Sequence, residues 1–316
     1  MLPATHRAGR RRPPTEDPPP PDVRRRPGRG RLRLLPPLLA VGLLVLTAGT
    51  AGATTRHGDS GTDASHSIAV TAEDFSYALS TTEVASGLVR IRLDNEGSQP
   101  HQAQIGRFKP GVGVAQFEAL VKAGQPDKVI PLFDGFYGGP NAILSGDSQT
   151  TFQNLPPGHY LMLCFVPDPA TGMPHFAMGM YAGFDVVGSP DSRGMDAAQT
   201  VYAVDDLQFD IPGTLQTDRI VRYENRSTKD VHEFSIGRLH EGKTAADVVT
   251  WAQHPGGPPP YDEMGGAGAV NPGGEEWFTL HLPPGDYLAY CLVPDDETGQ
   301  AHAAMGMVKT FTVVDD

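Results

Sequence analysis

The sequence predicts an all-β protein with two tandem β-sandwich domains, each carrying one short helix. Residues 156–180 recur as residues 283–307, with the shared frame P-P-G-x-Y-L-x-x-C-x-V-P-D-x-x-T-G-x-x-H-x-A-M-G-M. Short segments of alternating hydrophobicity occur in both halves of the chain, and turn-forming residues separate them. A duplication of about 120 residues made of many short strands is typical of paired β-sandwiches.

The repeat also predicts the domain boundaries. Residues 1–53 are expected to form a basic tail followed by a signal peptide or membrane anchor, and residues 54–66 a flexible spacer. The first domain then covers 67–188, a turn-rich linker covers 189–199, and the second domain covers 200–316.

Charge is distributed unevenly along the chain. Residues 1–33 carry ten Arg against three acidic residues, whereas the rest carries 15 Lys and Arg against 34 Asp and Glu, a net charge of −19. Such an acidic body does not favour nucleic acid, which requires clustered basic side chains.

An uncharged apolar segment, residues 34–53, follows the basic tail and ends in Ala51-Gly52-Ala53. The small residues fit a signal-peptidase site, while the length also suits a retained membrane anchor. Both alternatives place the acidic body outside the cytoplasm, either secreted or at the outer face of the cytoplasmic membrane.

Individual elements follow from local patterns. Val89, Ile91 and Leu93 alternate with polar residues and predict a half-buried strand over 87–93. Apolar spacing predicts a short helix over 114–122 and, in the second domain, over 244–253, where Thr244 and Asp247 can form a capping box. Residues 133–144, rich in Gly and aromatic side chains, are expected to form a loop.

Each domain offers a cysteine, two histidines and a methionine in the same order. The candidate metal ligands are His101, Cys164, His175 and Met180 in the first domain, and His232, Cys291, His302 and Met307 in the second. Met178 and Met305 are the alternative thioethers. A thiolate, two imidazoles and a weak thioether form a ligand set that suits copper. Taken singly, each residue also fits a plainer role: a buried core cysteine, a loop histidine or a gap-filling methionine.

The cysteines occupy equivalent positions in the two repeats, so a disulfide between them is not expected. Ten residues separate each cysteine from the following histidine. The segment V-P-D-x-x-T-G within this interval predicts a turn that returns the histidine to the cysteine.

These motifs resemble those of the cupredoxins, most closely the plastocyanin-like branch. Asn95-Glu-Gly-Ser-Gln-Pro-His101 is similar to the family's N-x-G-x-x-P-H motif. The segment from Pro157 to Cys164 is similar to its P-G-x-Y-x-x-x-C strand, and the segment from His175 to Met180 to its H-x-x-x-G-M ending. The resemblance implies Greek-key sandwiches with at most one copper per domain and Met180 and Met307 as axial ligands. The first domain keeps more of the signature, because the second lacks the proline before His232, and ten residues between Cys and His exceed the family's usual spacing.

Together with the apolar segment 34–53, which indicates export, the resemblance implies an exported protein that transfers single electrons to and from a redox partner protein. Copper storage or delivery, and a metal-free cell-surface binding module, are the alternatives. An oxidase or reductase is not expected, because the sequence contains no H-x-H motif from which such enzymes build further copper centres.

Overall fold

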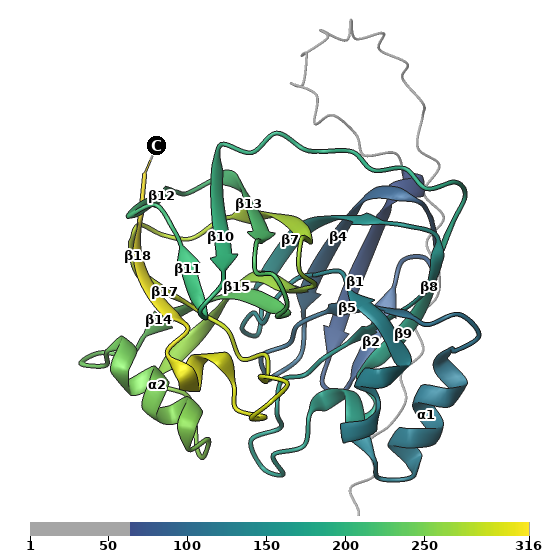
Figure 1. Ribbon diagram of the computed structural model, residues 1–316, viewed down its shortest axis with the longest axis horizontal. Helices are drawn as coiled ribbons and strands as arrows, with labels where there is room; N and C mark the ends of the chain where they lie inside the picture. The colour runs from purple at the N-terminus through teal and green to yellow at the C-terminus, as the bar shows by residue number, and fades with distance from the viewer. Residues whose placement is uncertain (1–63, 316) are drawn as a thin grey trace, which may run out of the picture. The chain divides into compact units, whose positions relative to one another are not determined.

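The strands of the first half of the protein form two sheets that face each other. The computed structural model describes residues 64–315, and the first half contains strands β1 to β9 (Figure 1). One sheet has the order β2-β1-β4-β7 and the other the order β3-β9-β8-β5-β6. The bounds are β1 Ser67–Glu73, β2 Ser76–Leu79, β3 Glu83–Ala85, β4 Gly87–Asn95, β5 Gln104–Phe108, β6 Phe133–Phe136, β7 Ser148–Leu155, β8 Gly158–Leu163 and β9 Tyr181–Val187.

Side chains from both sheets share one hydrophobic core. Val89, Ile91 and Leu93 of β4 are fully buried, and they belong to the same cluster as Tyr160 of β8 and Phe184 of β9. The alternation predicted over 87–93 is therefore confirmed, and the first half is a β-sandwich.

The second half repeats this arrangement with strands β10 to β18. Its sheets have the orders β11-β10-β13-β16 and β12-β18-β17-β14-β15, which match those of the first half strand for strand. The bounds are β10 Gln199–Val204, β11 Gln208–Asp210, β12 Thr214–Gln216, β13 Arg219–Asn225, β14 His232–Leu239, β15 Tyr261–Val270, β16 Glu275–Leu280, β17 Gly285–Tyr290 and β18 Val308–Val314. The all-β prediction with two Greek-key sandwiches is confirmed.

The two sandwiches are joined through their sheets. Strands β7 and β16 pair in antiparallel fashion, so that eight strands form one continuous sheet across both halves. We call this boundary the seam. The loop predicted over 133–144 is only partly correct, because its first residues form β6. Isolated bridges then connect Tyr137 to Val270, Pro140 to Ala267 and Ile143 to Met264 in β15.

Both predicted helices are present. Helix α1, Val114–Lys122, buries Phe117 among aromatic side chains of the first half. Helix α2, Ala245–Gln253, begins at Thr244, whose backbone N–H donates to the Asp247 carboxylate while its hydroxyl accepts from the Asp247 N–H. The predicted capping box is therefore confirmed. Five 3-10 turns complete the structure: η1 Ala64–His66, η2 Pro126–Lys128, η3 Ile130–Leu132, η4 His175–Met178 and η5 His302–Met305.

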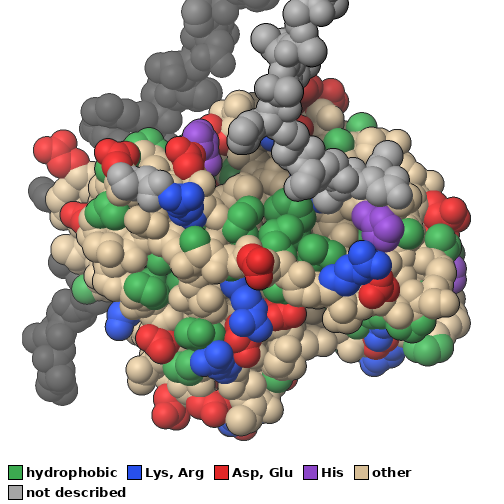
Figure 2. All heavy atoms as spheres, turned by 90° about the horizontal axis from the view of Figure 1, so that it is seen from above, with side chains coloured by type: hydrophobic (Ala, Val, Ile, Leu, Met, Phe, Trp, Pro, Cys, Tyr) green, Lys and Arg blue, Asp and Glu red, His purple; other side chains and the backbone are tan. Residues whose placement is uncertain are grey.

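The predicted basic tail and apolar segment, residues 1–53, lie outside the described residues. Within residues 64–315, no helix is both long and apolar enough to cross a membrane. On the face drawn in Figure 2, acidic and basic side chains are interspersed.

Candidate metal centres

Three donor side chains of the first half meet in its interior. His101 lies just before β5, Cys164 directly follows β8, and His175 opens η4. The Cys164 Sγ lies 3.5 Å from the His175 Nδ1 and 3.9 Å from the His101 Nδ1, and the two Nδ1 atoms are 3.1 Å apart. All three residues are fully buried. The structure thus brings together three of the four ligands predicted for this half.

The inserted segment between Cys164 and His175 folds back on itself. Pro167 and Pro174 pair as an isolated bridge, and the His175 N–H donates to the Val166 carbonyl over 2.9 Å. At the tip, the Asp168 carboxylate accepts from the N–H and the hydroxyl of Thr171, both over 2.8 Å. The turn predicted from V-P-D-x-x-T-G is confirmed, and it cancels the extra length by returning His175 to Cys164.

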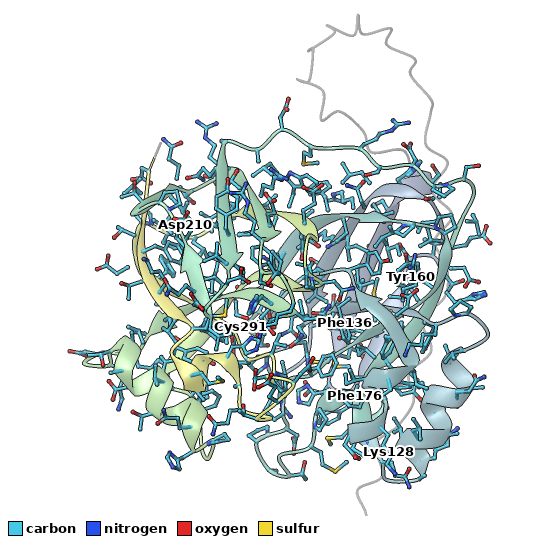
Figure 3. All side chains as sticks on the ribbon, in the orientation of Figure 1. Lys128, Phe136, Tyr160, Phe176, Asp210 and Cys291 are labelled. Carbon is cyan, nitrogen blue, oxygen red and sulfur yellow. The ribbon has the colours of Figure 1, made fainter. Side chains whose placement is uncertain are left out.

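The second half contains an equivalent cluster. The Cys291 Sγ lies 3.4 Å from the His302 Nδ1 and 3.9 Å from the His232 Nδ1, and these nitrogens are 3.0 Å apart. Asp295 and Thr298 form the corresponding turn. Figure 3 labels Cys291 in one half and Phe176, the neighbour of His175, in the other.

The hydrogen bonds of the first cluster leave both inward nitrogens without protons. The Nε2 of His101 lies 3.0 Å from Asp74 Oδ1, and the Nε2 of His175 lies 3.1 Å from Gln99 Oε1. Since a carboxylate and an amide oxygen only accept, each Nε2 carries the hydrogen and each Nδ1 presents a lone pair. Two lone pairs 3.1 Å apart beside a thiol form a donor set that a cation between them would satisfy. Metal–nitrogen and metal–thiolate bonds of about 2.0 and 2.3 Å place such donors roughly 3–4 Å apart, as observed.

Asp74 and Gln99 are residues that the sequence reasoning missed. Asp74 also accepts from the Ser98 N–H and hydroxyl, and this carboxylate network lowers its pKa to about 2. Gln99 donates to Asp168, so the returning turn and the His175 ring are linked through one side chain. An aspartate at the corresponding place of the second repeat, Asp205, was the available signal. Such outer partners orient metal-binding histidines.

The outer nitrogens of the second cluster differ. The Nε2 atoms of His232 and His302 are buried and have no hydrogen-bond partner within residues 64–315. The Asp205 carboxylate accepts from the Thr228 N–H and hydroxyl, as the Asp74 carboxylate accepts from those of Ser98. Within residues 64–315, however, the His232 Nε2 has no hydrogen bond to Asp205. The first cluster is therefore the more completely oriented of the two.

Burial determines the protonation of the donors. It raises the pKa of the Cys164 thiol to about 12 and raises that of Cys291 well above its usual value. Burial and the neighbouring imidazole lower the pKa of His175 and of His232 to about 4. Both cysteines are free thiols, as predicted. At neutral pH a metal therefore meets neutral imidazoles and displaces one proton from each thiol.

The candidate methionines also differ in how deeply they are buried. Met180 and Met307 are fully buried, whereas Met178 and Met305 are 36% and 43% exposed. The Met180 backbone contacts the first cluster directly, since its carbonyl accepts from the Cys164 N–H and its N–H donates to the His175 carbonyl. Of the two thioethers in this half, Met180 is thus the one beside the buried donors.

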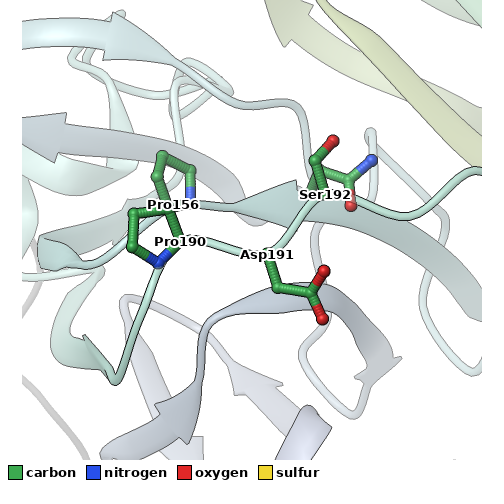
Figure 4. A pocket seen from close by; sticks show the side chains of 5 residues that line it. Pro156, Pro190, Asp191 and Ser192 are labelled. Atoms are coloured by element: carbon green, nitrogen blue, oxygen red, sulfur yellow. The ribbon is translucent and has the colours of Figure 1, made fainter.

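A hollow lined by Asn154, Pro156, Pro190, Asp191 and Ser192 lies elsewhere, where the predicted linker crosses the end of β7 (Figure 4). Its lining contains no histidine or cysteine, and it forms no part of either cluster.

The sequence matches no protein-family model and no curated protein. Among solved structures, a reduced auracyanin of Roseiflexus castenholzii is 24% identical over 38% of this chain and 99% of its own, with a TM-score of 0.27. An azurin of Methylomonas sp. strain J is 16% identical over 40% of this chain and all of its own, with a TM-score of 0.25. A multicopper oxidase is 18% identical over 78% of this chain and 88% of its own, with a TM-score of 0.22.

These scores are low, so the class of the protein rests on its own strands and donors. Each half is a β-sandwich that gathers one cysteine and two histidines from the ends of neighbouring strands. The donor chemistry fits copper, at most one ion in each half. Each half therefore has the sandwich fold and the cysteine and histidine donors that the resemblance implied.

Proposed function

We propose that the protein is an exported copper protein that transfers single electrons through two mononuclear centres. The ligands are His101, Cys164, His175 and Met180 in the first half, and His232, Cys291, His302 and Met307 in the second. One observation carries the proposal: in each half, two imidazole Nδ1 atoms face each other within 3.1 Å beside a buried cysteine sulfur. Bound copper supplies a reversible one-electron couple, and its potential is set by the axial ligand and the surroundings of the sulfur.

Rigid attachment of the donors favours electron transfer over copper storage. In the first half, the backbone N–H of Cys164 donates to the Met180 carbonyl, and that of His175 donates to the Val166 carbonyl. The backbone N–H of Phe176 donates to the Cys164 carbonyl. Corresponding bonds fix His302 and Met307 in the second half. Donors held in this way change little between the two oxidation states of copper. A storage site has no need of such a preorganised, single-ion cage.

A carrier is also favoured over an oxidase. Enzymes with further copper centres need additional histidines, and the sequence contains no H-x-H motif. Export is supported by the basic tail followed by the apolar segment 34–53, which ends in small residues. The carrier exchanges its electron with a redox partner protein, and the net charge of −19 beyond residue 33 favours a basic one.

Stoichiometric redox cycling tests the proposal. Copper-loaded protein is reduced with ascorbate and reoxidised with ferricyanide while its visible absorption is followed. A carrier loses and regains its colour over repeated cycles, with one electron taken up per bound copper and no copper released. Tight binding of Cu(I) without colour would instead favour storage or delivery. Failure to bind copper by elemental analysis would favour the metal-free binding module.

A further inference from the structure

The seam connects the two candidate centres through buried polar residues. The segment containing Asn141, Ala142 and Ile143 lies between His101 of the first half and β15 of the second half. Ile143 exchanges both backbone hydrogen bonds with His101, a candidate ligand of the first centre, each over 3.1 Å. One end of this segment is therefore bonded directly to the first centre.

The other end reaches the second half through the Asn141 side chain. Its Nδ2 donates to the Ser235 hydroxyl over 2.8 Å and to the Ala267 carbonyl over 3.0 Å. Ser235 lies two residues from Glu233 on the same strand, β14. We call Asn141, Ser235 and Glu233 the junction. All three are more than nine-tenths buried.

Glu233 completes the connection to the second centre. Its Oε1 accepts from the Leu292 N–H over 2.7 Å, and Leu292 is bonded covalently to Cys291. Glu233 is also the chain neighbour of His232. The first half has Gln102 beside its own ligand His101, so among these two ligands only His232 has a buried carboxyl group as its chain neighbour.

We propose that the junction is the route by which an electron passes between the two copper centres. This inference rests on the proposed function. The route runs from His101 through Ile143, Ala142 and Asn141 to Ser235, along the backbone of β14 to Glu233, and then through Leu292 to Cys291. Electrons tunnel more readily through covalent and hydrogen bonds than across gaps between packed atoms, and this route has no such gap. The transfer oxidises one centre by one electron, reduces the other by one electron, and moves no proton.

The test compares two asparagines of the seam. Asn141→Leu removes the hydrogen bonds of the junction while keeping a similar volume. Asn271→Leu is the matched control, because the Asn271 Oδ1 accepts from the Phe136 N–H across the same seam but lies off the route. Fully copper-loaded protein receives a sub-stoichiometric pulse of reductant, and the re-equilibration between centres is followed optically. We expect a phase independent of protein concentration that slows several-fold in Asn141→Leu and is unchanged in Asn271→Leu.

A second measurement needs no copper. Amide hydrogen exchange at Leu292 in the metal-free chain is expected to accelerate about tenfold in Asn141→Leu. The reason is that loss of the bond from Asn141 to Ser235 loosens β14 beside Glu233, the acceptor of the Leu292 N–H. It is expected to remain unchanged in Asn271→Leu. Asn141→Ser, which is smaller, is measured in parallel and must give the same direction if Asn141→Leu does not fold.

The outcomes separate the two proposals. Two coloured centres that cycle normally, with an inter-centre rate equal in wild type and Asn141 variants, would overturn the route and leave the carrier function intact. Slowing by the same factor in Asn271→Leu would also overturn it, since that result reflects general loosening of the seam. A chain that binds no copper would overturn both.

Discussion

At the scale of single residues, Gly97 accounts for the difference between the two candidate centres. A Cβ atom at this position would lie 2.5 Å from the His101 Nε2 and 2.6 Å from Asp74 Oδ1. Only glycine therefore leaves room for the bond between Asp74 and His101. Ser227 stands at the equivalent turn position of the second half, and there His232 Nε2 has no partner.

Removing the outer partner of His101 should weaken copper binding at the first centre only. We expect Asp74→Ala to raise the copper dissociation constant of that centre about 10–100-fold, the usual cost of losing such a partner. Gly97→Ser should act in the same direction. Asp205→Ala is the matched control, because Asp205 holds its turn without contacting His232. Competition with a chelator, measured on variants that keep one cysteine, reports each centre separately. Equal losses in Asp74→Ala and Asp205→Ala would contradict this account.

The axial ligand can be tested by exchanging neighbouring methionines. Met180→Leu should keep the visible colour of the first centre and raise its reduction potential, because the weak thioether donor is lost. Met178→Leu changes an exposed side chain of the same type and should leave the potential unchanged. Optical redox titration measures both. A shift in Met178→Leu alone would reassign the axial ligand.

At the scale of elements, the turns after the two cysteines return each histidine donor to its cysteine. Asp168 and Asp295 each accept from the backbone and hydroxyl of a threonine three residues later. Gly172 and Gly299 follow with φ of +70°, a conformation that favours glycine. The ten residues between each cysteine and the following histidine therefore do not keep the two side chains apart, because the inserted residues pair with one another.

Loosening one turn should affect its own centre. In Asp168→Ala, loss of the bonds to Thr171 and Gln99 should weaken copper binding at the first centre about tenfold, a cost of roughly 1–1.5 kcal/mol. Asp295→Ala should do the same to the second centre and spare the first. Copper titration of each variant checks this. An unchanged affinity in both would mean that the turn does not position the histidine.

The elements also mark where prediction from the sequence reached its limit. The capping box of α2 was predictable because Thr244 and Asp247 are three residues apart, and β4 because its alternation is local. Strand β6 was not, because it pairs with β5 on the far side of helix α1 in the sequence. The bridges after it were not, because segment 137–143 pairs with residues 264–270 of the other half. The cysteine and histidine donors were predictable from their order and repetition. Asp74 and Gln99 were not, since their roles appear only once the turns pack together.

At the scale of the whole molecule, the seam makes the two halves one structure and buries a carboxyl group. Glu276 in β16 is fully buried, and its Oε1 accepts from the Gly139 N–H over 3.1 Å and from the Gln153 amide over 3.0 Å. Its Oε2 has no hydrogen-bond partner in the part of the chain that the structure describes. Burial raises the pKa of Glu276 well above its usual value. The folded protein therefore favours the neutral carboxyl group.

This shift predicts a pH dependence of stability. A carboxyl group whose pKa is raised by folding adds most to the free energy of unfolding below its unfolded pKa of about 4.3. This stabilisation is lost as the pH rises from that value through the folded pKa. Glu276→Gln should remove this dependence and raise the free energy of unfolding at neutral pH by about 1–3 kcal/mol. Glu275→Gln, at the half-exposed neighbour paired with Arg222, should change stability by less than about 1 kcal/mol. Denaturant unfolding of the metal-free chain from acidic to mildly alkaline pH checks both, and a steeper loss of stability with pH in Glu276→Gln would contradict the prediction.

The most direct test of the central claim is a Cu(II) titration of the purified protein followed by visible absorption and elemental analysis. The account predicts an intense band in the orange-red region that saturates at no more than one copper per half. Cys164→Ser and Cys291→Ser should each remove the contribution of one centre, and the double variant should be colourless. A wild-type protein that stays colourless and retains no copper, or a band that survives in the double variant, would contradict it.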